Sequence, residues 1–337
     1  MQVSFIIPLY NCLALTQECL RTLQATLPAG LAHEIILVDD GSTDGTREWL
    51  AGLCQPAVSL SHPPPVASGP CRALLNDRNL GFAATCNRGA AEAAGELLFF
   101  LNNDLLLLPH WLEPMLGAFD RSADAGLVGN VQLNAATGSV DHSGIFFNSK
   151  GKPQHDTTLP FARHFWPAAN FRPVEALTGA CFGVRRAVWQ KLGGFDEKFV
   201  NGSEDIDLCL RARAAGLRHY IALRSVVRHH ISASPGRNLR NEQNTFRLVL
   251  RWQDQIARQA ARDWSRQQII IHADQSGVFD YAMIFAALSY WLVLSVPPSR
   301  VRQGVAAAMA LEQQRWRELF EGAPALPAPV PIRTDQI

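Results

Sequence analysis

The feature that most constrains this chain is the stretch 95–104, which reads GELLFFLNND. Its centre, Leu97–Leu101, is an unbroken apolar run that ends abruptly in Asn102, Asn103 and Asp104. A run so short and so apolar is typical of a central strand covered on both faces. Open α/β sheets bind ligands beyond the carboxyl ends of their strands. The stretch therefore predicts a carboxylate, with two amides beside it, at the rim of a sheet.

Strand and helix patterns alternate through the N-terminal part of the chain. The segments Val3–Ile7, Glu34–Asp40, which ends in two carboxylates, and Gly126–Leu133 are typical of strands, and a helix rich in small residues, Ala83–Ala94, precedes the stretch 95–104. This alternation predicts an α/β fold with a mostly parallel, Rossmann-like sheet and helices on both faces. The mixed segment 134–173 predicts loops and short antiparallel strands.

Bulk composition limits the class of protein and its partners. The 337 residues are 47% hydrophobic and 18% charged, which is enough for a globular core and an appendage. A net charge of +1 gives no basic field, so no nucleic-acid partner is expected. Seven cysteines without a Cys-x-x-Cys pair are typical of reduced thiols, and the N-terminus lacks a basic signal-peptide region. We therefore expect a cytoplasmic protein.

The C-terminal part predicts a separate helical region. We expect one domain over residues 1–235 and a helical region over 236–337, which ends in a Pro-rich tail from Pro324. Within it, Tyr281–Val296 is apolar and uncharged but shorter than the ~20 residues that span a bilayer. A buried helix is favoured. A helix on the inner face of the cytoplasmic membrane and a homodimer contact through the C-terminal helices remain alternatives.

The first strand lacks the glycines that cradle phosphates. It ends in Pro8, Leu9, Tyr10 and Asn11, where a dinucleotide-binding domain carries Gly-x-Gly-x-x-Gly. A nucleotide bound at this sheet would therefore need a metal or basic side chains to balance its phosphates.

Asp104 is the candidate metal ligand, because Mg²⁺ usually lies between one or two carboxylates and substrate phosphates. Taken alone, Asp104 is better interpreted as a turn or capping residue, given Pro109 downstream. For Asp39 and Asp40, which end the neighbouring strand, capping of an Asp-Gly-Ser-Thr turn and binding of a base or ribose are equally supported.

Two further polar groups also have two interpretations. Glu204 and Asp205 begin a helix, where acidic side chains are stabilised by ~0.3–1 kcal/mol, but either could serve as a general base. His229 and His230 end a strand; single histidines are more often structural, although an imidazole at an oxygen site would suit Mn²⁺ somewhat better than Mg²⁺.

The order of these groups is more specific than any one of them. The chain resembles glycosyltransferase family 2, enzymes of the GT-A fold, over most of residues 1–235. Five blocks carry the resemblance: 5–11 (FIIPLYN), 38–46 (VDDGSTDGT), 79–82 (NLGF) with 87–89 (NRG), 101–104 (LNND), and 193–197 (GGFDE) with 204–211 (EDIDLCLR). The last block is similar to the bacterial surface-polysaccharide branch, which includes rhamnosyltransferases.

The resemblance implies an inverting glycosyltransferase that depends on a divalent metal, Mn²⁺ or Mg²⁺. The donor would be a nucleoside-diphosphate sugar (UDP, dTDP or GDP) and the acceptor a glycan or lipid-linked hydroxyl. Asp205 would be the catalytic base, and Asp104 and His229, with His230 as an alternative, would approach the metal. The residues implied in nucleotide-sugar binding are Pro8, Tyr10, Asp39, Asp40, Asn79, Gly81, Asn103 and Glu204.

One position departs from the family pattern, because Asn102 stands where its Asp-x-Asp metal motif begins. A sugar nucleotidyltransferase and a catalytically silent nucleotide-sugar-binding module are the alternative functions. A processive membrane polymerase is disfavoured because no Gln-x-x-Arg-Trp block is present.

Overall fold

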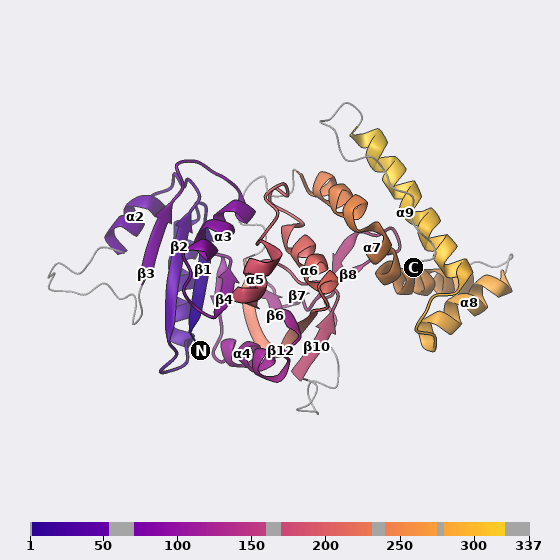
Figure 1. The fold of residues 1–337 in the computed structure, drawn as a ribbon, viewed down its shortest axis with the longest axis horizontal. Coiled ribbons are helices and arrows are strands. Elements are labelled where there is room, and N and C mark those ends of the chain that lie inside the picture. The colour runs from indigo at the N-terminus through magenta and orange to yellow at the C-terminus, as the bar shows by residue number, and fades with distance from the viewer. Residues whose placement is uncertain (1, 54–70, 160–169, 231–239, 275–279, 321–337) are drawn as a thin grey trace. The chain divides into compact units, whose positions relative to one another are not determined.

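A computed structural model describes residues 2–53, 71–159, 170–230, 240–274 and 280–320 (Figure 1). The chain divides into two compact units. The first comprises Met1–Ile145 and His155–Asn238, and the second comprises Phe146–Gln154 and Leu239–Ile337. The expected boundary at 235/236 and the expected Pro-rich tail lie outside the described residues.

The described part of the first unit is built on a ten-stranded sheet in the order β10-β12-β6-β11-β4-β1-β2-β3, with β5 beside β12 and β7 beside β6. The strands are β1 (Val3–Leu9), β2 (His33–Asp39), β3 (Cys71–Leu75), β4 (Leu97–Leu101), β5 (Leu105–Leu107), β6 (Ala125–Asn134), β7 (Val140–His142), β10 (Phe171–Val174), β11 (Cys181–Arg185) and β12 (Arg218–His229). Strands β1, β2, β3, β4, β6 and β12 run in one direction, whereas β5, β7, β10 and β11 oppose them. Two short strands, β8 (Ile145–Phe147) and β9 (Pro153–His155), form a second sheet. The expected α/β class is confirmed.

Leu97–Leu101, the centre of the stretch 95–104, forms β4 between β1 and β11, and all five residues are buried. Its aromatic side chains cover both faces of the sheet. Phe99 packs against Phe5, Trp111 and Phe119 at ring-centroid distances of 5.9, 6.2 and 6.5 Å. Phe100 stacks on Trp189 at 4.4 Å. The prediction of a central strand covered on both faces is confirmed.

Helices lie on both faces of the sheet (Figure 1). The helices of the first unit are α1 (Leu13–Thr26), α2 (Thr46–Leu53), α3 (Phe82–Ala91), α4 (Leu112–Arg121), α5 (Arg186–Leu192) and α6 (Glu204–Ala214). Side chains from α1, α2 and α4 share one core with Phe5 and Phe99. On the other face α3 lies very close to the sheet. The approach is so close that a Cβ on Gly89 would come within 2.6 Å of Ile6 and 2.9 Å of Val38. Small residues in this helix therefore set its distance from β1 and β2.

The described helices of the second unit are α7 (Asn241–Asp274), which is kinked at Trp252, α8 (Tyr281–Leu292) and α9 (Ser299–Leu319). α7 packs against both other helices, and Phe246 of α7 stacks on Trp316 of α9 with centroids 5.2 Å apart. The sequence expectation for α8 is wrong in one respect: the helix forms, but it buries only Ala286, Ala287 and Tyr290. No described helix has the length and apolar character needed to cross a membrane.

Candidate functional site

The polar residues that follow three neighbouring strands come to one edge of the sheet. β1 pairs in parallel with β2, with Leu9 opposite Asp39, and with β4, with Phe5 opposite Phe99. The carboxyl ends of these strands therefore meet, as the sequence predicted for Asp39 and Asp104. Pro8 is the penultimate residue of β1, close to this edge, and it is half-buried.

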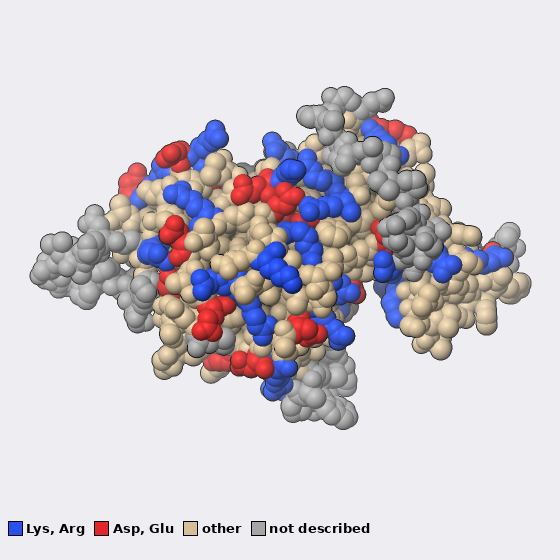
Figure 2. All heavy atoms as spheres, viewed as in Figure 1, with Lys and Arg blue, Asp and Glu red and all other residues tan. Residues whose placement is uncertain are grey.

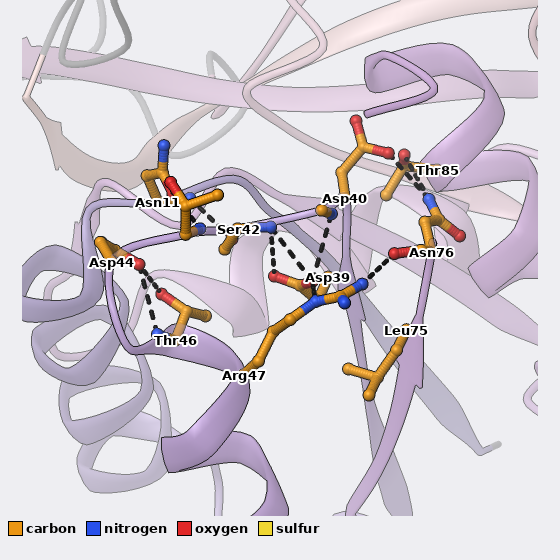
Figure 3. A network of polar contacts seen from close by, with 12 residues as sticks. Asn11, Asp39, Asp40, Ser42, Asp44, Thr46, Arg47, Leu75, Asn76 and Thr85 are labelled. Carbon is orange, nitrogen blue, oxygen red and sulfur yellow. Dashed lines mark hydrogen bonds and ion pairs between the residues drawn. The ribbon is translucent and has the colours of Figure 1, made fainter. Parts of the chain in front are cut away.

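Asp39 holds the turn that follows β2. Its fully buried carboxylate accepts hydrogen bonds from the backbone N–H groups of Gly41 and Ser42, both at 3.2 Å, and from Arg47 Nε at 2.8 Å (Figure 3). Both carboxylate oxygens of Asp39 are therefore engaged inside the protein. The Arg47 guanidinium also donates to the carbonyl oxygen of Asn76, so the ion pair connects the turn with β3.

Asp40 fixes the loop that follows β3. Its Oδ1 accepts from Asn76 Nδ2 and from the Leu80 N–H, both at 2.8 Å, and its Oδ2 accepts from the Gly81 N–H at 2.9 Å. Figure 3 shows Asp40, Asn76 and Thr85 converging from three elements. The sequence reasoning missed Asn76, although the signal was available: Asn76 is a polar residue placed directly after a strand, as Asp40 and Asn102 are.

The turn after β2 requires glycine. Gly41 has φ +80°, and a Cβ there would lie 2.8 Å from the backbone carbon of Arg78 and 2.8 Å from the backbone nitrogen of Asn79. The backbone of Asn79 is thus packed onto the turn, while its side chain is exposed. Gly81, the N-cap residue directly before α3, is buried and has φ +89°.

The loop after β1 is held to the same turn. Asn11 has a left-handed backbone (φ 56°); its N–H donates to Ser42 Oγ at 2.8 Å, and its Oδ1 accepts from the Thr43 N–H at 2.8 Å (Figure 3). Asn103 Nδ2 donates to the Asn11 carbonyl oxygen at 3.3 Å. Tyr10, next to this anchor, is 39% exposed. Hydrogen bonds therefore fix the backbone of this loop, while the ring of Tyr10 is exposed to solvent.

Asp104 and His229 form a buried pair of side chains whose facing atoms make no hydrogen bond. Asp104 Oδ1 lies 3.2 Å from His229 Nε2, and the residues are only 6% and 5% exposed. That oxygen and both ring nitrogens of His229 have no hydrogen-bond partner. Buried polar atoms left in this state are costly, so the pair has the character of an incomplete ligand set.

Backbone pairing, and not a flexible loop, brings this pair together. β12 pairs with β5 so that His229 lies opposite Leu105, the residue after Asp104. The His230 N–H donates to the Asp104 carbonyl oxygen at 3.1 Å. The structure thus distinguishes the two histidines, because His229 is the one whose ring faces Asp104. Among the residues described, no group of three or more His, Cys, Asp or Glu side chains could hold a metal.

His142 is a second buried imidazole near this pair, and the sequence reasoning gave it no role. Both of its ring nitrogens lack hydrogen-bond partners. Burial, followed by the influence of His155, His229 and Arg172, lowers the pKa of His142 well below its usual value. Its ring contacts that of His155 edge-on, with centroids 4.9 Å apart. His142 is therefore a neutral imidazole beside His229.

Asp205 is connected to the end of β4 through one short segment. The Gly179 N–H donates to Asp205 Oδ2 at 2.6 Å, and the neighbouring Ala180 carbonyl accepts from the Asn102 N–H at 2.8 Å. The Ile206 N–H donates to Asp205 Oδ1 at 2.8 Å. Hydrogen bonds to the segment Gly179–Ala180 therefore connect Asp205 with Asn102, although roughly 100 residues separate the two in sequence.

Glu204, the first residue of α6, has one neighbour in common with Asp40, the Cys86 thiol. Glu204 is buried and accepts from the Gly202 N–H at 2.6 Å. Burial raises the pKa of the Cys86 thiol well above its usual value, and the negative charges of Glu204 and Asp40 raise it further. Both carboxylates are therefore close enough to the Cys86 thiol of α3 for their charge to affect its pKa.

Comparison with known proteins gives a consistent result. The model of the family described as "Glycosyl transferase family 2" matches residues 4–193. The chain is 32% identical over 245 residues to the O-antigen biosynthesis protein RfbC of Myxococcus xanthus, a match that covers 69% of this chain and 18% of that protein. It is 31% identical over 225 residues to an N-acetylglucosaminyl-diphospho-decaprenol L-rhamnosyltransferase of Mycobacterium tuberculosis, covering 60% of this chain and 68% of that protein.

Solved structures show the same fold. The crystal structure of GalNAc-T7 with UDP, GalNAc and Mn²⁺ superposes with a TM-score of 0.60 at 15% identity, covering 98% of this chain and 59% of that one. The crystal structure of residues 1–349 of Staphylococcus aureus TarS superposes with a TM-score of 0.52 at 13% identity, covering 97% and 93% of the two chains.

Proposed function

Because the chain belongs to glycosyl transferase family 2, we propose that it transfers a sugar from a nucleoside-diphosphate sugar to a hydroxyl group of a glycan or lipid-linked acceptor. The observation that carries this proposal is the arrangement of Asp104, His229 and Asp205 around the end of β4. Relatives named for O-antigen biosynthesis and for L-rhamnosyl transfer support a surface polysaccharide as the product.

The buried pair fits a divalent cation. Asp104 offers a carboxylate oxygen and His229 an imidazole nitrogen, neither of which has a hydrogen-bond partner. An oxygen–imidazole set suits Mn²⁺ somewhat better than Mg²⁺. When bound, such a cation would neutralise charge on the diphosphate leaving group. The GalNAc-T7 structure, which contains UDP and Mn²⁺, supports this assignment.

Asp205 is proposed as the general base. As the acceptor hydroxyl oxygen forms its bond to the anomeric carbon, the bond from that carbon to the diphosphate oxygen breaks, and the hydroxyl proton passes to a carboxylate oxygen of Asp205. A single displacement of this kind inverts the anomeric configuration. The N–H groups of Gly179 and Ile206 orient the carboxylate.

The nucleotide is proposed to lie against the loops that follow β1 and β3. Tyr10 and Pro8 would form one side of this pocket, and the backbone of 79–81 would form the other. Asp39 would contribute chiefly by holding the turn after β2, and Asp40 by holding the loop after β3, because their oxygens already accept hydrogen bonds from these segments. Asn103 and Glu204 would support the same pocket through their bonds to Asn11 and Gly202.

A thermal-shift panel tests the donor and the metal together. The chain would be heated with UDP-, dTDP- and GDP-sugars, each with and without Mn²⁺. A ligand at 100 times its dissociation constant stabilises the native state by ~2.7 kcal/mol, so the donor would raise the melting temperature. Asp104→Ala should lose the part of the shift that requires Mn²⁺. An unchanged Mn²⁺-dependent shift in that variant would contradict the metal assignment.

A measurement of sugar transfer then distinguishes a glycosyltransferase from the two alternative functions. With the identified donor, Asp205→Asn should bind normally but transfer ~10²–10⁴-fold more slowly, which is the usual contribution of a general base. Asp120→Asn, an exposed carboxylate change on α4, is the matched control and should leave the rate unchanged. Donor binding without any transfer by the wild type would indicate a silent binding module, and sugar-nucleotide synthesis would indicate a nucleotidyltransferase.

A further inference from the structure

α8 and the segment that follows it expose an apolar surface, which we call the α8 face. It consists of Phe285, Trp291, Leu292, Val293, Leu294 and Val296, whose exposed fractions are 74, 45, 66, 82, 41 and 63%. No charged residue occurs between Tyr281 and Ser299. Contiguous exposed apolar surface of this kind marks an interaction site more often than chance exposure.

The orientation of α8 strengthens this point. The helix turns its small residues Ala286 and Ala287 inward, together with Tyr290, and turns Phe285 and Leu292 outward. A helix whose purpose is to complete a core would bury the large side chains instead. Within the second unit, α8 therefore has a packed side against α7 and a second side available to a partner.

The charge beside the α8 face is positive. Arg258, Arg262 and Arg266 are exposed and recur every fourth residue along α7, so they form one stripe. The Arg262 guanidinium lies 5.4 Å from the ring centroid of Tyr290, which places the middle arginine of the stripe beside α8. Figure 2 shows the largely uncharged surface over α8, at the lower right, bordered by Lys and Arg side chains.

Neither Asp263 nor Asp280 cancels this stripe. Asp263 is turned toward the Ser149 N–H and Gln267, at 2.8 Å from each. Asp280 pairs with Arg300 at 3.1 Å, so that pair adds no net charge.

We infer that the α8 face and the Arg258–Arg262–Arg266 stripe together dock onto an anionic lipid bilayer, with α8 lying in the interface. Aromatic and aliphatic side chains would enter the headgroup region, and the arginines would contact lipid phosphates. α8 has 12 residues and is thus ~18 Å long, well short of the ~30 Å hydrocarbon core, so it lies on the bilayer and does not span it. A second copy of the chain is a poorer partner, because a two-fold contact would bring two basic stripes to one interface.

Vesicle flotation of the full chain tests this inference. The wild type should float with vesicles of phosphatidylglycerol and phosphatidylcholine, bind at least tenfold less to pure phosphatidylcholine, and dissociate in part at high salt. Phe285→Ser/Leu292→Ser should lose most of the binding, and Arg258→Gln/Arg266→Gln should lose the preference for anionic vesicles. All of these side chains are exposed, so melting temperatures should stay near that of the wild type.

Leu311→Ser is the matched control. Leu311 is 71% exposed, and it lies on α9 about 18 Å along the helix from Ser299, outside the α8 face. Its vesicle binding should equal that of the wild type. The inference is overturned if the wild type ignores anionic vesicles or if Phe285→Ser/Leu292→Ser binds them normally. It is equally overturned if that variant instead abolishes a dimer seen by sedimentation without lipid. Failure of the donor panel would not affect this result, because no nucleotide is present.

Discussion

The Asp40→Asn substitution gives the sharpest test of the site's architecture. Asparagine retains one oxygen, which can still accept the hydrogen bonds from Asn76 and Leu80 that now reach Oδ1 at 2.8 Å. Its amide nitrogen would then face the Gly81 N–H, a donor that is now 2.9 Å from Oδ2. One charge-assisted hydrogen bond is lost, and one buried N–H is left without an acceptor.

The expected loss of stability follows from these contacts. Hydrogen bonds to charged groups contribute ~1.5–3 kcal/mol, and a buried unsatisfied donor costs ~1–3 kcal/mol, so a loss of about 3 kcal/mol is expected. For a unit of 150–250 residues this corresponds to a melting temperature lower by roughly 6–12 °C. Differential scanning fluorimetry without ligand measures the change directly.

The control is Asp77→Asn, which removes an exposed carboxylate from the same loop and should change stability by no more than about 0.5 kcal/mol. Donor affinity measured by calorimetry then separates two roles for Asp40. If Asp40 acts by holding the loop, affinity and melting temperature should fall together. A melting temperature within 1–2 °C of the wild type, accompanied by lost donor affinity, would refute the reasoning, since Asp40 would then act on the nucleotide alone.

Two further predictions concern other parts of the first unit. Burial lowers the pKa of His219 to about 4, and its ring accepts from the Leu127 N–H and donates to the Cys209 carbonyl. Since the unfolded chain binds this proton near pH 6.5, stability should fall by up to about 3 kcal/mol as the pH is lowered from ~6.5 to ~4, and His142 should act in the same direction. Melting temperatures across this range would show it, and a His219→Gln variant as pH-sensitive as the wild type would contradict it. Gly41→Ala should destabilise the chain by ~1–3 kcal/mol in urea denaturation, because φ is +80° and the new Cβ would meet backbone atoms at 2.8 Å. Gly52→Ala, where no atom lies within 4 Å and the residue is helical, should be neutral or stabilising, and equal effects of both changes would exclude the steric explanation.

The features that could be predicted from the sequence are those that depend on local sequence pattern. The β4 strand was predictable because an apolar run of that length needs cover on both faces, which Phe99 and Phe100 provide. The family was predictable because its blocks occur in order, and the match over residues 4–193 confirms it. The proximity of Asp104 and His229 was implied only by the resemblance, since it depends on the register between β5 and β12.

Other features depend on partners that a sequence pattern does not reveal. The carboxylate of Asp40 accepts hydrogen bonds from backbone N–H groups of a distant loop, and nothing in a strand-ending Asp-Asp pair indicates which loop this is. The exposure of α8 was mispredicted for a similar reason. Apolar composition shows that a helix can be buried, but only the neighbouring helices decide how much of it is covered, and α7 and α9 leave Phe285 and Leu292 outside.

β12 contains a bulge in its pairing with β6, and this bulge affects how the site can vary in related chains. Ala222 lies opposite Asn130, and Val226 lies opposite the very next residue of β6, Val131, so Leu223, Arg224 and Ser225 are extra residues in one strand. The pairing after this bulge is anchored separately, through β6 and through Leu105. A residue gained or lost within the bulge would be absorbed there, as bulges absorb unpaired residues. The sequence and length of β12 before the bulge can therefore change while the part after the bulge keeps its register, so that the imidazole of His229 stays in place.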